Sequence, residues 1–343
     1  MSGEAVRDRL ARLLRSPPPE ASVESVADKL RARAARTKLA APALPSGIAC
    51  EPDSGVLARR ETLAPEHTHG DWRLAEALGA DPRPLALVAH DPGLASVDLA
   101  SALYLDTETS GLSGGAGTWV FLVGLGSFRD GRFEVWQGFL AEPAEERELL
   151  AEAAARIASA SAIVSFFGKS FDRHRLEDKM RLHGIAPPFA GRPHLDLYHP
   201  LRRLYGSGFA DARLKTLERG LCGVEREDDL PGSRAPAAWF DFLHGRKSEL
   251  EGVFRHNRDD VLSLVTLAAH LARTLDETRA DGSPLAGPSA PRARGIAKCL
   301  AIAREHAGAL EWFARADERG GGALSAAEER LRRRAQRCIS RAS

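Results

Sequence analysis

The sequence predicts an α/β fold in which a mixed sheet of five strands is flanked by helices. Between about residues 100 and 200, apolar runs with the length of strands alternate with segments of helical periodicity. Asp130 and Gly131 separate two of these runs, and an Asp-Gly pair is a strong hairpin signal. The hairpin predicts antiparallel pairing at the edge of an otherwise parallel sheet.

Each expected element has its own signal in the sequence. Short apolar runs predict strands at 101–106, 118–128, 132–139, 161–167 and 193–199. Apolar stripes of helical spacing predict helices at 143–160, 172–183 and about 248–273. The first of these helices has a proline near its start, which is a favoured position for proline.

The composition is that of a globular protein without a dominant charge. The chain has 343 residues, of which 43% are hydrophobic and 28% charged, so it can bury a sizeable core. Its net charge of +1 provides no global field towards nucleic acid or membrane, and any anion-binding surface must be local. The four cysteines show neither zinc spacing nor a disulfide pattern, and no apolar stretch is long enough to span a bilayer. We therefore expect a cytoplasmic protein that does not bind membranes.

Changes in composition along the chain predict five segments. We expect residues 1–44 to form a basic helical extension and linker, and 45–99 to form a lead-in segment packed on the core. Residues 100–273 contain the strands and helices described above. Residues 274–292 are rich in proline and glycine, as in a linker, and 293–343 have helical periodicity. The basic residues of the first segment can contact phosphates or form a solvated helix face.

Two carboxylates stand where the first expected strand ends. Asp106 and Glu108 follow an apolar run, and side chains two residues apart on a strand point to the same face. Like charges this close repel unless something positive lies between them, and a divalent cation meets that need. The residues that follow, Thr109 to Gly111, are also typical of a surface turn, so this pair alone does not decide between a metal site and a turn.

Acidic residues occur in two further places. Asp172 stands at the start of a helix that follows a strand, where an aspartate is most often an N-cap. On the last helix of the core, His256 and Asp260 are four residues apart and share a face, whereas Asp259 points more towards solvent. An ordinary helix pair of histidine and aspartate explains that spacing as well.

The three places together favour a metal site. Carboxylates at a strand end, after a second strand and on a late helix can converge at one edge of a sheet. Four carboxylates can bind two divalent ions about 3.5–4 Å apart, as in two-metal phosphoryl transfer, and oxygen ligands suit Mg²⁺ or Mn²⁺. His256 lies one helical turn from Asp260, so it can take or orient a proton of the attacking water.

Several motifs in a fixed order resemble those of one family. The motifs are "LDTETSGL", "GKSFD", "PHLDLYHPLRRLY", "LKTLE", "DLPG" and "HNRDDV". They are similar to the DEDD exonucleases of the ribonuclease H-like superfamily and, more narrowly, to the YprB-like ribonuclease H domain of bacterial proteins. The resemblance covers about 100–273 strongly and about 45–100 more weakly, and it implies a ribonuclease H-like fold. It also implies that Asp106, Glu108, Asp172 and Asp260 bind the metal ions.

The chain departs from the family pattern at two positions. His256 stands four residues before the last aspartate, where one branch of the family has tyrosine, while the other branch has its histidine five residues before. Phe167 replaces an asparagine that the resemblance places near the substrate. The first departure concerns the general base, and the second concerns the positioning of the substrate.

Basic residues near the expected site can contact a phosphate backbone or belong to a solvated surface. These residues are Lys169, Arg173, Arg175, Arg202, Arg203, Arg213 and Lys215. Thr109, beside Glu108, is a further expected substrate contact. Tyr205 and Phe209 can stack on a terminal base, although packing in the core is the more common role of such residues.

The sequence thus predicts a metal-dependent 3′–5′ exonuclease that acts on DNA or RNA with two Mg²⁺ or Mn²⁺ ions. A structure-specific endonuclease with the same carboxylates is one alternative, and a catalytically weak nucleic-acid-binding module is another. The presence of all four acids favours an enzyme, and Phe167 leaves room for the binding module. The sequence does not distinguish DNA from RNA and does not predict an oligomeric state.

Overall fold

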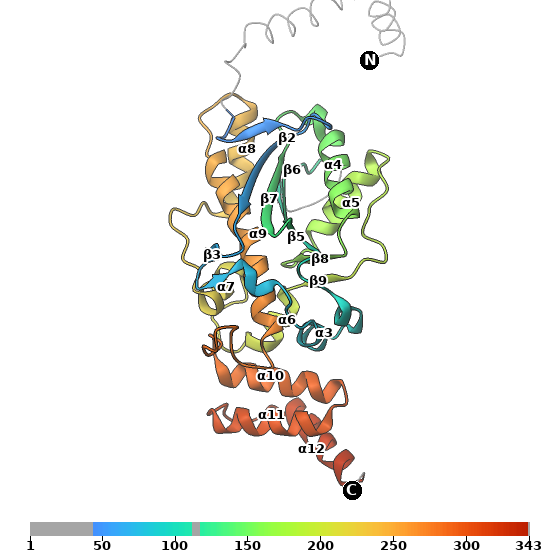
Figure 1. The fold of residues 1–343 in the computed structure, drawn as a ribbon, viewed down its shortest axis with the longest axis vertical. Coiled ribbons are helices and arrows are strands. Elements are labelled where there is room, and N and C mark those ends of the chain that lie inside the picture. Colours follow the sequence, from blue (N-terminus) through green and yellow to red (C-terminus); the bar gives the residue numbers. More distant parts are fainter. Residues whose placement is uncertain (1–43, 112–116, 342–343) are drawn as a thin grey trace, which may run out of the picture. The chain divides into compact units, whose positions relative to one another are not determined.

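The computed structural model describes residues 44–111 and 117–341 (Figure 1). The helices expected before residue 40 lie outside the described residues. Within the described part of the chain, seven strands form one main sheet in the order β1-β2-β7-β6-β5-β8-β9. Helices cover this sheet, so the predicted α/β class with a mixed sheet is confirmed.

The main sheet combines an antiparallel and a parallel half. Its strands are β1 (Ile48–Cys50), β2 (Leu57–Leu63), β5 (Ala102–Thr109), β6 (Val120–Arg129), β7 (Arg132–Phe139), β8 (Ala162–Ser165) and β9 (His194–Asp196). Strands β5, β8 and β9 are parallel, whereas β6, β7, β2 and β1 each pair antiparallel with their neighbours. Two further short strands, β3 (Thr68–His69) and β4 (Trp72–Arg73), pair separately.

The predicted number of strands was too small by two. Five strands lie where the sequence predicts them, but β1 and β2 come from the segment expected only to pack on the core. β2 carries Arg59, Arg60 and Glu61 in its seven residues. Such a charged strand gives little apolar signal, and its place between β1 and β7 becomes visible only in the assembled sheet.

Helices pack on both faces of the sheet. The described α-helices are α3 (Arg83–Ala89), α4 (Glu146–Ala158), α5 (Asp172–Leu182), α6 (Tyr198–Tyr205), α7 (Leu214–Cys222), α8 (Ala235–Leu243), α9 (Leu250–Ala272), α10 (Ser289–Ile302), α11 (His306–Glu318) and α12 (Ala326–Ser340). The last three pack on one another and, through α10, on α6 and α3. Along β5, Leu103 and Leu105 belong to the core that includes α4 and α5, while Tyr104 belongs to the core that includes most of α9. Because side chains alternate along a strand, Asp106 and Glu108 fall on the same face as Tyr104.

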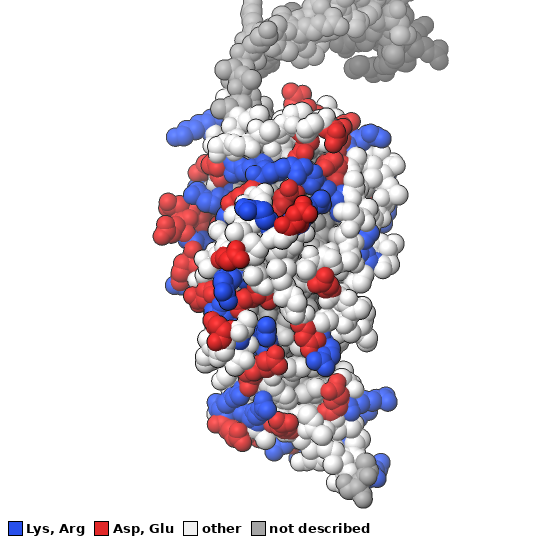
Figure 2. All heavy atoms as spheres, in the orientation of Figure 1, with Lys and Arg blue, Asp and Glu red and all other residues white. Residues whose placement is uncertain are grey.

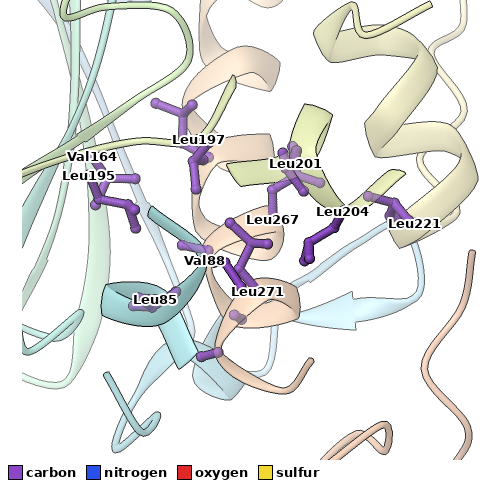
Figure 3. Close-up of a cluster of buried hydrophobic side chains, with 14 of the residues drawn as sticks. Leu85, Val88, Val164, Leu195, Leu197, Leu201, Leu204, Leu221, Leu267 and Leu271 are labelled. Carbon is purple, nitrogen blue, oxygen red and sulfur yellow. The ribbon is translucent and has the colours of Figure 1, made fainter. Parts of the chain in front are cut away.

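The core on the α9 side is built mainly from leucines. Figure 3 shows leucine and valine side chains of α3, α6, α7, α9, β8 and β9 packed together. Helix α10 adds to this core and begins at Ser289, inside the stretch expected to be a linker. It approaches α6 so closely that a Cβ atom on Gly295 would lie 2.8 Å from the Leu204 Cα atom.

The surface carries both charges side by side. On the face shown in Figure 2, basic and acidic side chains are interspersed, in keeping with the small net charge. Among the described helices, none combines the length and the hydropathy that a membrane span requires.

Candidate active site

Asp106 and Glu108 lie near the end of β5, and two side-chain amides, which we call the amide clamp, hold Asp106. The Asn257 Nδ2 atom donates to Asp106 Oδ2 at 2.7 Å, and Gln137 Nε2 donates to Asn257 Oδ1 at 2.8 Å. Glycine is required opposite this clamp, because a Cβ atom on Gly124 would lie 2.3 Å from Asn257 Oδ1. Residues of β6, β7 and α9 therefore fix the first carboxylate.

Asp172 meets these acids from the start of α5. It is buried, and its Oδ1 atom accepts two hydrogen bonds from Thr107, one from the backbone N–H at 3.1 Å and one from the hydroxyl at 2.5 Å. The N-cap of α5 is Phe171, and no side chain caps that helix. Asp172 thus accepts hydrogen bonds from the neighbouring strand β5 and does not act as the N-cap of its own helix.

His256 and Asp260 share a face of α9, as their spacing predicts. The His256 Nε2 atom lies 3.5 Å from Asp260 Oδ2 and 4.0 Å from Glu108 Oε1. The other ring nitrogen, Nδ1, lies 2.8 Å from Asp229 Oδ1. An ionised carboxylate only accepts hydrogen bonds, so Nδ1 is the donor in this contact, and in the neutral ring Nε2 is free to accept a proton.

A buried arginine lies behind His256. Arg226 forms ion pairs with Glu218 at 2.6 Å and with Asp260 at 2.5 Å, and its side chain is 3% exposed. Asp229, which holds His256, also accepts from Lys215 Nζ at 3.1 Å. Asp260 is therefore the one acid of the four that has a close arginine partner among the described residues.

The electrostatics of the site favour protonated acids. Burial, together with the negative charges of Asp260, Asp172 and Glu108, raises the pKa of Asp106 well above its usual range. Burial also raises the pKa of Glu108 to about 8, and that of Asp172 to about 6 even though Thr107 opposes the shift. For His256, burial lowers the pKa, but Asp260, Glu108 and the hydrogen bond to Asp229 outweigh it, so the pKa is raised. The site has excess negative charge that a cation would relieve.

The types of ligand at this site suit a hard divalent cation, but the side chains are not oriented towards one common point. Four carboxylates supply the oxygen ligands that Mg²⁺ and Mn²⁺ prefer. In the described part of the chain, however, no three acidic, histidine or cysteine side chains converge as a ready-made metal site. The reason is visible in the contacts above: Asp106 faces Asn257, Asp172 faces Thr107 and Asp260 faces Arg226.

The predicted substrate residues have different surroundings. Lys169 is partly exposed and lies 3.9 Å from Asp91, and the Arg202 guanidinium lies 5.9 Å from the Tyr198 ring centre. Thr109 is buried and its hydroxyl donates to the Gly111 carbonyl at 3.1 Å. The remaining two are bound within the protein: Arg203 donates to the Val88 carbonyl, and Lys215 pairs with Asp229. For all five, contact with a substrate stays a prediction.

Several residues of the site were not singled out from the sequence. Asp229 belongs to the "DLPG" motif and Asn257 to the "HNRDDV" motif, so motif membership was the available signal. Arg226 had no signal of its own. Tyr205 is buried and bonded to His270, and Phe209 packs on Tyr205, so neither predicted stacking residue is an exposed platform.

Comparison with known proteins identifies the fold. Residues 103–272 match the family model of the RNase H superfamily, so this part of the chain is an RNase H-like domain. Within it, the chain is YprB-like: it is 33% identical over 174 residues to the uncharacterized protein YprB of Bacillus subtilis (strain 168). This match covers 50% of the present chain and 42% of YprB, so the chain corresponds to less than half of that relative.

A solved structure is also similar. The family B DNA polymerase from the hyperthermophilic archaeon Pyrobaculum calidifontis superposes with a TM-score of 0.40 and 20% sequence identity. The superposition covers 59% of this chain and 29% of the polymerase. A similarity of this size is too low to inform the site.

Proposed function

We propose that the protein is a metal-dependent nuclease that removes nucleotides from the 3′ end of DNA or RNA. The observation that carries the proposal is that Asp260, Asp172 and Glu108 lie near enough to Asp106 for their charges to raise its pKa. Beside them lies His256, whose Nδ1 atom is held by Asp229. The RNase H-like domain supports a nuclease-type activity. The 3′–5′ direction comes from the resemblance of the motifs to DEDD exonucleases.

Each residue has a defined task in this proposal. Asp106, Glu108, Asp172 and Asp260 would hold two Mg²⁺ or Mn²⁺ ions, which supply Lewis-acid stabilisation and a more acidic water. The Nε2 atom of His256 accepts a proton from the attacking water, because Nδ1 is already the donor to Asp229. Asp229 is a positioning residue, since it fixes the tautomer and the ring orientation of His256.

The test is hydrolysis of end-labelled oligonucleotides by the full chain. We expect release of mononucleotides with 5′ phosphates from a 3′-labelled strand in Mg²⁺ or Mn²⁺ and no release in EDTA. A closed single-stranded circle should resist the enzyme, because it has no 3′ end. Efficient cutting of the circle would instead establish the endonuclease alternative, and activity that persists in EDTA would refute the metal-dependent mechanism.

One observation favours the second candidate, a catalytically weak module that binds nucleic acid. The ion pair between Arg226 and Asp260 places a fixed cation against one of the four acids. If this pair persists when metal is added, Asp260 is not available as a ligand. Binding of the oligonucleotide without hydrolysis at any Mn²⁺ concentration would then identify this candidate.

A further inference from the structure

Phe167 is an exposed aromatic residue in an unfavourable backbone conformation. Its φ angle is 59°, in the left-handed region, which costs a bulky L-residue about 1–2 kcal/mol. Its side chain is not buried in return, because the residue is 43% exposed. Neither backbone preference nor burial accounts for a phenylalanine here, and such outliers cluster at functional sites.

The surrounding backbone holds Phe167 in this conformation. The Asp196 carboxylate accepts from the N–H groups of Phe167 at 2.8 Å and of Lys169 at 3.1 Å. Gly168, between them, packs so tightly that an added Cβ atom would lie 2.4 Å from Ser165 Oγ and 3.2 Å from Asp172 Oδ2. The loop is therefore fixed directly beside an acid of the candidate active site, with the Phe167 ring reaching solvent.

The ring lines a hollow that combines aromatic and cationic groups. The hollow has a volume of about 310 Å³, and its lining consists of Phe166, Phe167, Tyr198, Ala212 and Arg213. The Tyr198 ring centre lies 5.0 Å from that of Phe167 at an interplanar angle of 74°. The Arg213 side chain is 84% exposed. Aromatic faces bind nucleobases by stacking, and arginine binds the phosphates beside them.

We infer that this hollow binds an unpaired nucleobase of the substrate strand, stacked on Phe167, with Arg213 beside an adjoining phosphate. The inference rests on the proposed function and narrows its substrate to a single-stranded segment, because a base in this hollow has left the stack of a duplex. Phe167 thereby adds to the affinity for the substrate strand, at the position where the related family has an asparagine. Stacking does not depend on the identity of the base, so the hollow accepts DNA and RNA strands of any sequence.

Two oligonucleotides separate base contacts from backbone contacts. Binding to the full chain is measured by fluorescence anisotropy with a labelled single-stranded thymidine oligonucleotide and with an abasic oligonucleotide of equal length. Ca²⁺ replaces Mg²⁺, and the oligonucleotides are checked for integrity afterwards. Phe167→Ala should weaken binding of the thymidine strand about 5- to 150-fold, the range found for loss of one stacked base. Binding of the abasic strand should not change.

Further variants control for backbone strain and for exposed apolar surface. Phe167→Leu keeps an apolar side chain in the same backbone and should lose affinity as Phe167→Ala does, whereas Phe167→Trp should keep it. Leu182→Ala is the matched control, since Leu182 is 61% exposed and lies at the other end of α5, about 15 Å along the helix from Asp172. This control should bind as the wild type does.

The outcomes distinguish the inference from the proposed function. If the wild type hydrolyses and binds the thymidine strand, but Phe167→Leu binds it equally well, the hollow does not hold a base and the nuclease proposal survives. Equal losses for the abasic and thymidine strands would overturn the inference in the same way. If the wild type neither binds nor hydrolyses either strand, both proposals fall.

Discussion

Two groups of buried charged side chains in this domain are balanced differently. Between α4 and α5, the Glu146 carboxylate is 2% exposed and pairs with Lys179 Nζ at 2.9 Å and with His183 Nε2 at 2.8 Å. The second group consists of Asp106, Glu108 and Asp172 at the end of β5. Asp106 accepts from the Asn257 amide, Asp172 accepts from the Thr107 hydroxyl, and Glu108 faces His256. The first group is nearly neutral when its members are ionised, whereas the second would then have a net negative charge, which is why the pKa values of its acids are raised.

The difference distinguishes a structural group from a functional one. A buried charge is tolerated when a partner of opposite charge compensates its lost hydration. Glu146 has such partners, so its group contributes to the packing of α4 on α5. Asp106 and Asp172 lack them and Glu108 has only His256 at 4.0 Å, and the raised pKa values of the three acids express the cost. In the proposed function, a divalent cation supplies the missing compensation.

The largest expected effect follows from removing one acid of the group at the end of β5. Asp106→Asn should lower hydrolysis about 10³-fold, because Lewis-acid stabilisation is worth several kcal/mol. Calorimetric titration with Mn²⁺ should show correspondingly weaker binding. Asp259→Asn is the matched control, since Asp259 pairs with Arg258 at 2.9 Å and should tolerate the change. Equal Mn²⁺ binding by Asp106→Asn and wild type would contradict the comparison.

The next effect concerns the histidine of the same group. His256→Ala should lower turnover about 10²–10⁴-fold with little change in Mn²⁺ affinity, because the four acids remain. Asp229→Ala should cost about 10–100-fold, the range found when an orienting partner is removed. In the double variant, loss of Asp229 should add nothing to the loss of His256. Additive losses would show that Asp229 acts independently of His256.

A substitution in the group around Glu146 should change the stability of the protein and not its turnover. Lys179→Met leaves the buried Glu146 with His183 alone and should lower the free energy of unfolding by about 3–5 kcal/mol, measured in urea. Hydrolysis per folded molecule should stay at the wild-type level. Arg181, on the same helix, is 57% exposed, and its partner Glu177 also pairs with Arg173, so Arg181→Met should cost about 0–1 kcal/mol. A fall in turnover for Lys179→Met would remove the distinction between the two groups.

The smallest effect is a pH dependence of the metal-free protein. The pKa of Glu108 is raised by burial to about 8 in the folded state, from 4.5. The folded state therefore binds this proton more tightly than the unfolded state, and the associated stability is lost as pH rises through 8. In EDTA, the melting temperature of the wild type should fall between pH 6 and 9 by a few degrees more than that of Glu108→Gln. A parallel fall in both proteins would assign the pH dependence to other groups.

The sequence by itself determined the central strands and the main helices, and it singled out the four acids as predicted site residues. Each of these has a local signal: an apolar run for β5 or β8, a stripe of helical spacing for α9, and i to i+2 or i to i+4 spacing for the paired site residues. Local signals depend on residues a few positions apart, so they survive without knowledge of the fold. The order of the motifs then indicated which acids belong together.

Only the tertiary structure decided which side chains meet the acids and which reach solvent. Asn257 lies 151 residues from Asp106, and Asp229 lies 27 residues from His256, so no periodicity of the chain relates them. The same holds for β2, whose charged residues become a strand only by pairing with β7. Exposure is likewise a property of the packed molecule: Tyr205 is buried against α9, whereas the fixed loop beside Asp196 turns Phe167 outward. Contacts and exposure depend on how segments far apart in the chain pack together, and a short stretch of sequence does not specify that packing.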